Sequence, residues 1–241
     1  MSVHRRMHNE SGFLLHTYPY RETSVIAEIW TRNYGRLSVV AKGARRPYSS
    51  LRGALLVFQP LLLGWSGKSE IKTLIQAEWQ GGQAWLSGRA LLCAYYLNEL
   101  LLRFTPKEDA QTVLFDSYRQ ALHSLAQGSG LSATLRRFEL CLLREIGYAP
   151  LFTQSILGVK IEQDAYYAYK PESGFELCDR VSTVKSPVVL GRTLKALSEG
   201  DFSNPQIVYE AKILLRALME PYLGSKPLEA RRVLTDIMEF E

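Results

Sequence analysis

The segment GRLSVVAKGARRPYSSLRGALLVFQPLLLGW, residues 35–65, joins two apolar runs, 37–41 and 54–63, through a connector rich in Gly, Ser and cationic side chains. The connector carries Lys42, Arg45, Arg46 and Arg52, and no acidic residue lies between positions 32 and 70. A cationic loop held between two strands suits a polyanion such as nucleic acid. The alternative is a solvated surface loop that happens to be basic, and the loop alone does not decide between the two.

The net positive charge of the 241-residue chain lies in its N-terminal third. Residues 1–80 hold 11 Lys and Arg against 5 Asp and Glu, a net +6, whereas residues 81–241 hold 18 against 19, a net −1. This asymmetry predicts an anionic partner, nucleic acid or a membrane surface, for the N-terminal part. The hydrophobic content of 46% and the charged content of 22% are typical of a globular protein.

The first 80 residues show short β-type runs separated by turn signals. The five predicted strands are 13–18, 24–31, 37–41, 54–63 and 70–79. Five such strands predict a small closed barrel, and the five-stranded OB-fold is a barrel of this kind that binds single strands. Pro60 removes a ladder donor from the fourth run and marks a bend or an edge. About one helical turn fits near 48–52, between the third and fourth strands.

After Gly81 and Gly82 the hydrophobic period changes to about 3.6 residues, which predicts helices. These cover 87–104, 110–126, 132–146, 187–198, 205–222 and 227–240, and two short runs between 166 and 178 predict a hairpin. We therefore expect an α+β protein with two domains that join at 80–83. An N-terminal OB-fold β-barrel (1–80) precedes an α-helical domain (81–241) with a small β-hairpin insert.

No motif for catalysis, metal binding or a cofactor is apparent in the sequence. The histidines lack zinc-site spacing, and Gly67-Lys-Ser69 lacks the first glycine of a P-loop. Cys93, Cys141 and Cys178 are far apart, as in a reduced cytosolic protein. The longest apolar stretch, 90–102, is too short to span a bilayer. We expect a cytoplasmic protein that is not an enzyme, holds no metal and does not contact a membrane.

Aromatic residues are interleaved with the N-terminal charges, and exposed aromatic rings can stack on nucleic-acid bases. Most of them alternate within strands and are expected in the barrel core. Tyr34 and Tyr48 fall in predicted loops and are therefore the candidates for base stacking, with packing as the alternative.

The helix predicted over 132–146 carries an arginine among leucines. Arg136 projects between Leu140 and Leu143, and such a set can grip a peptide that has an acid beside an apolar residue. The alternative is an arginine whose stem covers the core while its guanidinium pairs with Glu139.

Motifs along nearly the whole chain resemble the RecO family of recombinational repair proteins. They are RETS (21–24), GR (35–36), VAKGARR (40–46), LRG (51–53), YLNEL (96–100), LRRFE (135–139), GY (147–148) and PYLG (221–224). The resemblance implies an N-terminal OB-fold, a helical C-terminal domain, binding of single- and double-stranded DNA, annealing of complementary strands and cooperation with RecR. It also implies help in loading the RecA recombinase onto strands coated by single-stranded-DNA-binding protein, whose acidic C-terminal tail the family contacts.

The resemblance also bears on individual residues. Arg136 is the first Arg of the LRRFE motif and corresponds to the family's tail-binding arginine, with Leu140 and Leu143 as expected pocket walls. Many family members carry a four-cysteine zinc module after the GY motif. Here the corresponding region, about 151–185, keeps only Cys178, so we predict no zinc.

We therefore predict a non-enzymatic DNA-binding mediator of recombinational repair, in the cytoplasm and associated with the nucleoid. Two alternatives stay open, an RNA-binding OB-fold protein that uses the same surface and a repair scaffold that does not bind DNA. The expected DNA-binding residues are Arg36, Lys42, Arg45, Arg46, Arg52, Tyr34 and Tyr48.

Overall fold

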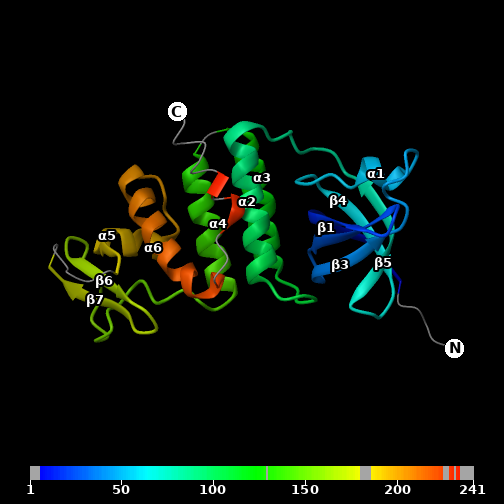
Figure 1. Cartoon of the computed structure of the whole chain (residues 1–241). Helices are drawn as coiled ribbons and strands as arrows, with labels where there is room; N and C mark the ends of the chain where they lie inside the picture. The colour runs from blue at the N-terminus through cyan, green and yellow to red at the C-terminus, as the bar shows by residue number, and fades with distance from the viewer. Residues whose placement is uncertain (1–5, 129, 180–185, 225–227, 231, 234–241) are drawn as a thin grey trace. The chain divides into compact units, whose positions relative to one another are not determined.

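The computed structural model describes residues 6–128, 130–179, 186–224, 228–230 and 232–233, and Figure 1 colours them in chain order. Contacts divide the chain into two compact units. The barrel unit comprises residues 1–128 together with 229–241, and the helical unit comprises residues 129–228.

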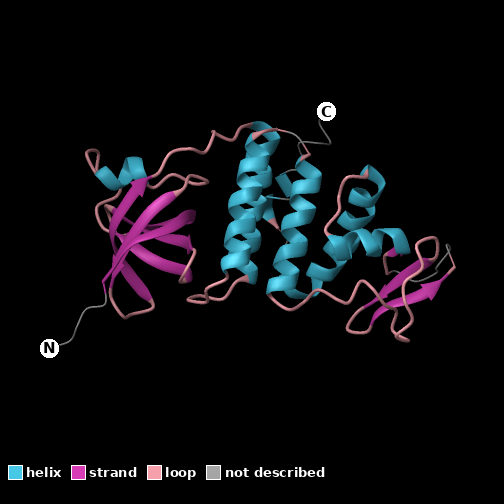
Figure 2. Cartoon of the chain, turned by 180° about the vertical axis from the view of Figure 1, so that it is seen from behind, coloured by secondary structure: helices cyan, strands magenta, loops and turns pink. Residues whose placement is uncertain are grey.

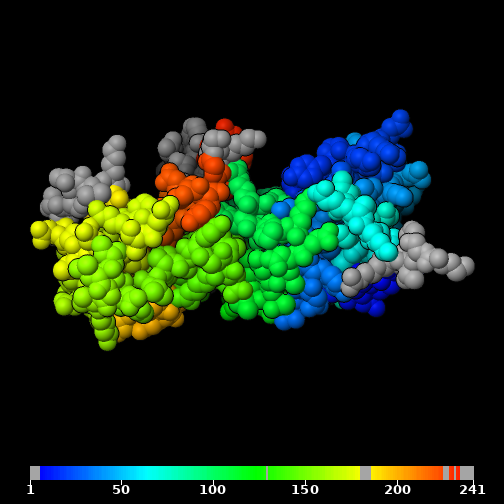
Figure 3. All heavy atoms as spheres, turned by 90° about the horizontal axis from the view of Figure 1, so that it is seen from below, coloured from blue at the N-terminus to red at the C-terminus, as the bar shows by residue number. Residues whose placement is uncertain are grey.

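The barrel unit begins with a closed five-stranded barrel, drawn in magenta in Figure 2 and in blue to cyan in the space-filling view of Figure 3. Its strands are β1 (Arg6–Tyr20), β2 (Ser24–Thr31), β3 (Gly35–Ala41), β4 (Leu61–Ser66) and β5 (Ile71–Trp79). They close in the order β1-β2-β3-β5-β4, with β3 and β5 parallel, and the short helix α1 (Ser50–Ala54) lies between β3 and β4 in the chain. This topology confirms the predicted OB-fold.

The fourth strand is shorter than the sequence pattern predicts. Residues 54–60 end α1 and then run irregularly, with Phe58 at a φ of +64°, so β4 begins only at Leu61. Pro60 explains the late start, because a residue without an N–H group is tolerated at the start of a strand but not within a ladder. The predicted helical turn between the third and fourth strands is confirmed as α1.

The barrel core follows from the alternation of apolar residues along the strands, which places every second side chain on the inner face. The most deeply buried residues of this core include Ala27, Ile29, Val39 and Leu63, each with no exposed surface. The remaining side chains of each strand therefore point to the outer face of the barrel.

Two helices of the barrel unit, α2 (Gly88–Phe104) and α3 (Thr112–Ala126), cover part of that outer face. The Phe13 ring of β1 lies 5.5 Å from the Phe115 ring and 5.2 Å from the Tyr118 ring of α3, measured between centroids. The amide of Asn98 in α2 donates to the backbone carbonyl of Leu15 at 2.8 Å. Residues 80–83, where we predicted the domain joint, form no helix or strand. The contacts group α2 and α3 with the barrel, so the division into compact units falls after α3. The domain joint at 80–83 stays a prediction.

The helical unit contains α4 (Leu131–Glu145), α5 (Gly191–Glu199), α6 (Pro205–Leu223) and a three-stranded sheet of order β7-β6-β8. The strands β6 (Tyr166–Lys170) and β7 (Gly174–Cys178) confirm the predicted hairpin. The helix predicted over 187–198 is wrong at its start, because Val188–Leu190 forms β8 and pairs with β6. Two adjacent β-branched residues favour a strand there. The helix predicted over 227–240 falls largely outside the described residues.

The start of β3 supplies a test of the barrel unit. Gly35 has a φ of +66°, and a Cβ at this position would lie 1.9 Å from the carbonyl oxygen of Asp109. We expect Gly35→Ala to lower the free energy of unfolding by more than the about 1–2 kcal/mol that a left-handed non-glycine residue costs. Gly53→Ala is the matched control, because no atom lies within 4 Å of its added methyl group. Urea unfolding followed by tryptophan fluorescence measures both, and equal stability of the two variants would contradict the expectation.

Candidate nucleic-acid interface

Four cations of the predicted loop are exposed to solvent: Lys42, Arg45, Arg46 and Arg52. The first three follow β3, and Arg52 belongs to α1. Within the described part of the chain, none of the four makes an ion pair. Their charges are therefore available to an anionic ligand.

The backbone that carries these cations is fixed to the barrel. The N–H of Arg45 donates to the carbonyl of Thr23 at 2.8 Å, and the N–H of Gly43 donates to the hydroxyl of Ser24 at 3.2 Å. Ala44, between them, is buried in the barrel core. The loop is thus anchored to the turn between β1 and β2, so its cations are held at a defined rim of the barrel.

The same turn adds a cation that the sequence analysis did not place in the site. Arg21 has a φ of +52°, is exposed, and its guanidinium carbon lies 5.2 Å from the centre of the Tyr20 ring. In the sequence, the position of Arg21 between two predicted strands indicates only that it lies in a hairpin turn. We define the cationic rim as Arg21, Lys42, Arg45, Arg46 and Arg52.

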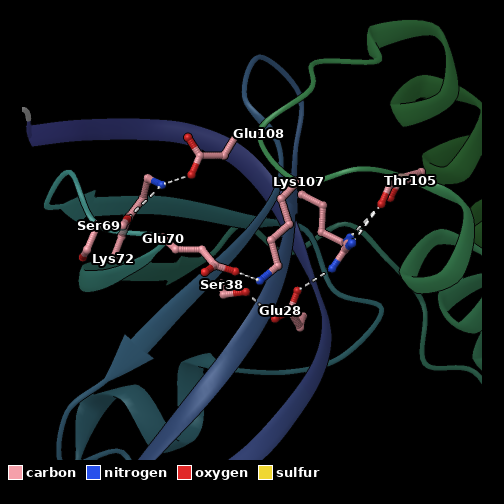
Figure 4. Close-up of polar contacts among 9 residues, drawn as sticks. Glu28, Ser38, Ser69, Glu70, Lys72, Thr105, Lys107 and Glu108 are labelled. Carbon is pink, nitrogen blue, oxygen red and sulfur yellow. Dashed lines mark hydrogen bonds and ion pairs between the residues drawn. The ribbon is translucent and has the colours of Figure 1, made fainter.

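Arg36 does not belong to the cationic rim. Its guanidinium donates to Glu28 at 2.9 Å and twice to the carbonyl of Thr105, at 2.8 and 3.2 Å. Only 14% of its side-chain surface is exposed, and 9% of that of Glu28. Figure 4 shows Glu28 and Thr105 at this contact, where the segment after α2 lies against the barrel. Arg36 is therefore engaged inside the barrel unit, and we remove it from the candidate interface.

Two more ion pairs hold the segment after α2 to the barrel, as Figure 4 also shows. Lys107 pairs with Glu70 at 2.7 Å, and Lys72 pairs with Glu108. The hydrogen bond from Lys107 lowers the pKa of the Glu70 carboxyl. The N–H of Glu108 also donates to the carbonyl of Arg36 at 2.9 Å. This side of the barrel is thus covered by the chain itself.

The two predicted stacking residues differ in their surroundings. Tyr34 packs against the barrel core, with its ring edge-on to Trp65 at 5.3 Å between centroids. Tyr48 is fully exposed beside the cationic rim. Tyr48 therefore remains a candidate for base stacking. Tyr34 instead packs in the barrel, which was the alternative to base stacking.

An open groove of about 860 Å³ within the barrel unit has walls from the barrel, residues 81–83 and α3. Its polar side chains are of both signs, among them Asp116 and Arg119. Asp116 pairs with Arg32 at 3.0 Å, and the hydrogen bond from Arg32 lowers the pKa of this carboxyl. The charges of the groove thus neutralise one another. The groove lacks the unpaired positive charge with which the cationic rim can attract a polyanion.

The predicted tail-binding residues are buried in α4 of the helical unit. Arg136 is 6% exposed, and its guanidinium pairs with Glu139. This pairing was the alternative to a peptide-binding role for Arg136. Leu140 and Leu143 are 2% and 0% exposed. The three side chains therefore do not form an open pocket in this structure. Arg137, the next residue, is exposed and lies over the Phe202 ring at 6.0 Å.

The region that corresponds to a zinc module is held by aromatic packing. The Phe175 ring of β7 lies 5.8 Å from Phe152 and 5.9 Å from Tyr169 between centroids. Burial raises the pKa of the Cys178 thiol, which disfavours the thiolate that a metal requires. Among the described residues, no three or more His, Cys, Asp or Glu side chains lie together in a way that could hold a metal ion. The absence of zinc stays a prediction.

The same described part of the chain contains no helix that is both long and apolar enough to cross a membrane.

Comparison with known proteins finds matches over nearly the whole chain. The family model described as recombination protein O N terminal matches residues 5–82, and that described as recombination protein O C terminal matches residues 86–232. The DNA repair protein RecO of Azoarcus sp. is 47% identical over 242 residues, covering 99% of this chain and 100% of the relative. That of Aromatoleum aromaticum is 46% identical over 246 residues with the same coverage. That of Burkholderia orbicola is 46% identical over 232 residues, covering 96% of this chain and 84% of the relative.

The geometry of Arg36 predicts a structural defect rather than a binding defect. Arg36→Ala leaves the buried Glu28 without its cation, and breaking such a pair costs about 3 kcal/mol or more. Arg45→Ala is the matched control, since removing an exposed arginine changes the free energy of unfolding by less than about 0.5 kcal/mol. Denaturant unfolding measures both. A stable Arg36→Ala protein that no longer binds DNA would return Arg36 to the interface.

Proposed function

The chain belongs to the recombination protein O family, and from this membership and its cationic rim we propose that it is a DNA-binding mediator of recombinational DNA repair. The observation that carries the proposal is the set of exposed cations on an anchored loop. Arginine and lysine side chains in such a position neutralise backbone phosphates without reading the sequence. Binding to single- and double-stranded DNA then follows from one surface.

Annealing of complementary strands follows from the same charges. Two DNA strands repel each other through their phosphates, and cations that neutralise both strands lower this repulsion. We propose that the cationic rim supports annealing in this way, and that the protein acts with RecR to help RecA load onto strands coated by single-stranded-DNA-binding protein. No catalytic residue is needed for these steps. We propose that the protein carries out these steps in the cytoplasm, at the nucleoid.

RNA offers the same phosphate backbone, so RNA binding is the nearest alternative function. The cationic rim by itself does not distinguish ribose from deoxyribose. A titration with matched ribo- and deoxyribo-oligonucleotides separates the two functions, and DNA binding that is no tighter than RNA binding would favour the alternative. A free protein that binds neither would favour a repair scaffold.

Charge reversal in the cationic rim tests DNA binding. We expect Arg45→Glu with Arg46→Glu to weaken binding of single strands of every sequence and to slow annealing. If each arginine neutralises one phosphate, the slope of log affinity against log salt becomes shallower by about 1.4, since each phosphate of a single strand contributes about 0.7. Fluorescence anisotropy across a salt series measures the slope.

The matched control for this variant reverses two exposed cations of α6, Lys212→Glu with Arg216→Glu, which changes the net charge equally. We expect the control to bind and anneal DNA nearly as the unchanged protein does. If the two double variants behave alike, the effect comes from net charge, and the cationic rim is not the DNA site.

The acidic tail of single-stranded-DNA-binding protein is the proposed partner of the helical unit. A carboxylate that binds Arg136 has to take the place of Glu139, because the two side chains are paired and buried. Leu140 and Leu143 also have to become accessible. The proposal therefore requires a local rearrangement of α4, with competition between Glu139 and the tail.

This competition gives a signed prediction. Arg136→Ala removes a charge-assisted pair worth about 1.5–3 kcal/mol, so affinity for a labelled tail peptide falls about tenfold to a hundredfold. Glu139→Gln removes the competitor and raises that affinity. Arg137→Ala, an exposed neighbour, leaves it unchanged. Anisotropy with the peptide and circular dichroism of each variant check the outcome, and tail binding that is indifferent to both Arg136 and Glu139 places the pocket elsewhere.

A further inference from the structure

The outer face of the barrel sheet is divided into a covered half and an open half. Phe13 and Arg36 lie in the covered half, beneath α3 and the segment after α2. Farther along β1, His16 and Tyr18 are exposed, with 48% of the Tyr18 surface accessible. The two rings contact each other edge-on at 4.5 Å between centroids. The two rings belong to an exposed surface to which the proposed function assigns no role.

The strand register extends this surface across four strands. Tyr18 pairs with Ile26 on β2, Ile26 pairs with Val40 on β3, and Val40 pairs with Thr73 on β5. Cross-strand partners lie on the same face of a sheet, with Cβ atoms about 5 Å apart. We name this row the apolar row, and its members are Tyr18, Ile26, Val40 and Thr73.

The apolar row is accessible and carries no charge. Ile26, Val40 and Thr73 are each partly exposed, and Ile75, two residues beyond Thr73, is 41% exposed. The neighbouring row contains Glu28, but that carboxylate is neutralised by Arg36 and accepts a hydrogen bond from Ser38. An anion that lies on this face therefore meets no unpaired acid of β2.

The cationic rim lies at the end of this same face. β1 leads through Tyr20 into Arg21, and β3 leads from Val40 through Ala41 into Lys42. Arg45 is hydrogen-bonded to the turn between β1 and β2. Aromatic rings with uncharged side chains around them, beside a line of cations, match one ligand chemistry: a strand whose unpaired bases lie on the sheet while its phosphates contact the cations.

We infer that the apolar row, with Tyr18 as its principal aromatic residue and His16 beside it, is a stacking surface for the unpaired bases of single-stranded DNA. The inference rests on the proposed function and goes beyond it, because it assigns base contacts to a surface separate from the phosphate contacts. Duplex DNA keeps its bases stacked inside the helix and gains nothing from this surface. The apolar row therefore makes the barrel prefer single strands.

The test compares three ligands: a short oligothymidylate, an abasic strand with the same number of phosphates, and duplex DNA, whose higher charge density makes it a reference for phosphate contacts alone. We expect the unchanged protein to bind the oligothymidylate more tightly than the abasic strand. Tyr18→Ala weakens oligothymidylate binding by a factor of about ten, a typical loss for one stacked base, and leaves the salt slope unchanged. The same variant binds the abasic strand and the duplex as before.

Two variants control for folding and for aromatic content. Tyr18→Phe keeps the ring and binds oligothymidylate as the unchanged protein does. Tyr209→Ala removes a comparably exposed tyrosine from α6 and has no effect. Oligothymidylate binding that survives Tyr18→Ala overturns the inference, as does an equal loss for the abasic strand. In either case, the effect of Arg45→Glu with Arg46→Glu decides separately whether the proposed DNA-binding function stands.

Discussion

The hydrogen bond from the Asn98 amide to the Leu15 carbonyl holds the barrel unit together at an irregularity of β1. The register of β1 with β2 shifts between Leu14 and His16, so Leu15 has no partner on β2. A bulged residue leaves its ladder groups unpaired, and a buried carbonyl without a partner is costly. Asn98 supplies the missing donor from α2, and its own carbonyl oxygen accepts from the Tyr118 hydroxyl of α3. Burial raises the pKa of Tyr118, which keeps that hydroxyl protonated and able to donate.

This bulge also decides which side chains of β1 meet the helices and which meet solvent. Before the bulge, Phe13 lies on the outer face against α3 and Leu14 lies in the barrel core. After it, His16 and Tyr18 lie on the outer face opposite Glu28 and Ile26 and are exposed. One extra residue therefore separates the part of the strand that builds the unit from the part that remains available to a ligand. The ion pairs after α2 complete the covered part, so the open part is bounded by protein on one side and by the cationic rim on the other.

The sequence predicts most of the barrel, because alternation, glycines and Pro60 are local signals. It also identifies the exposed cations of the loop, since no acid lies near them in the chain. It does not reveal the ion pair between Arg36 and Glu28, because Glu28 lies on the neighbouring strand and becomes close only through the register of β2 with β3. It does not reveal the exposure of Tyr18 for a related reason: Tyr18 follows a bulge that a strict alternation does not show. The ion pair of Arg136 could be predicted from the sequence, because Glu139 is three residues away on the same helix. The sequence therefore offered this pair as the alternative to peptide binding.

The size of the apolar row bears on how stacking and annealing can coexist. The row crosses four strands, which are spaced about 4.8 Å apart, so it spans about 14 Å. This length accommodates a few nucleotides at most, and the remaining bases of a bound strand stay free to pair. In the proposed binding mode, the cationic rim contacts phosphates without covering the Watson–Crick edges of the bases. On this proposal, a small stacking surface beside the cationic rim retains a single strand and leaves most of its bases exposed to a complementary strand. A long aromatic groove would bind more tightly, but it would sequester the bases that annealing requires.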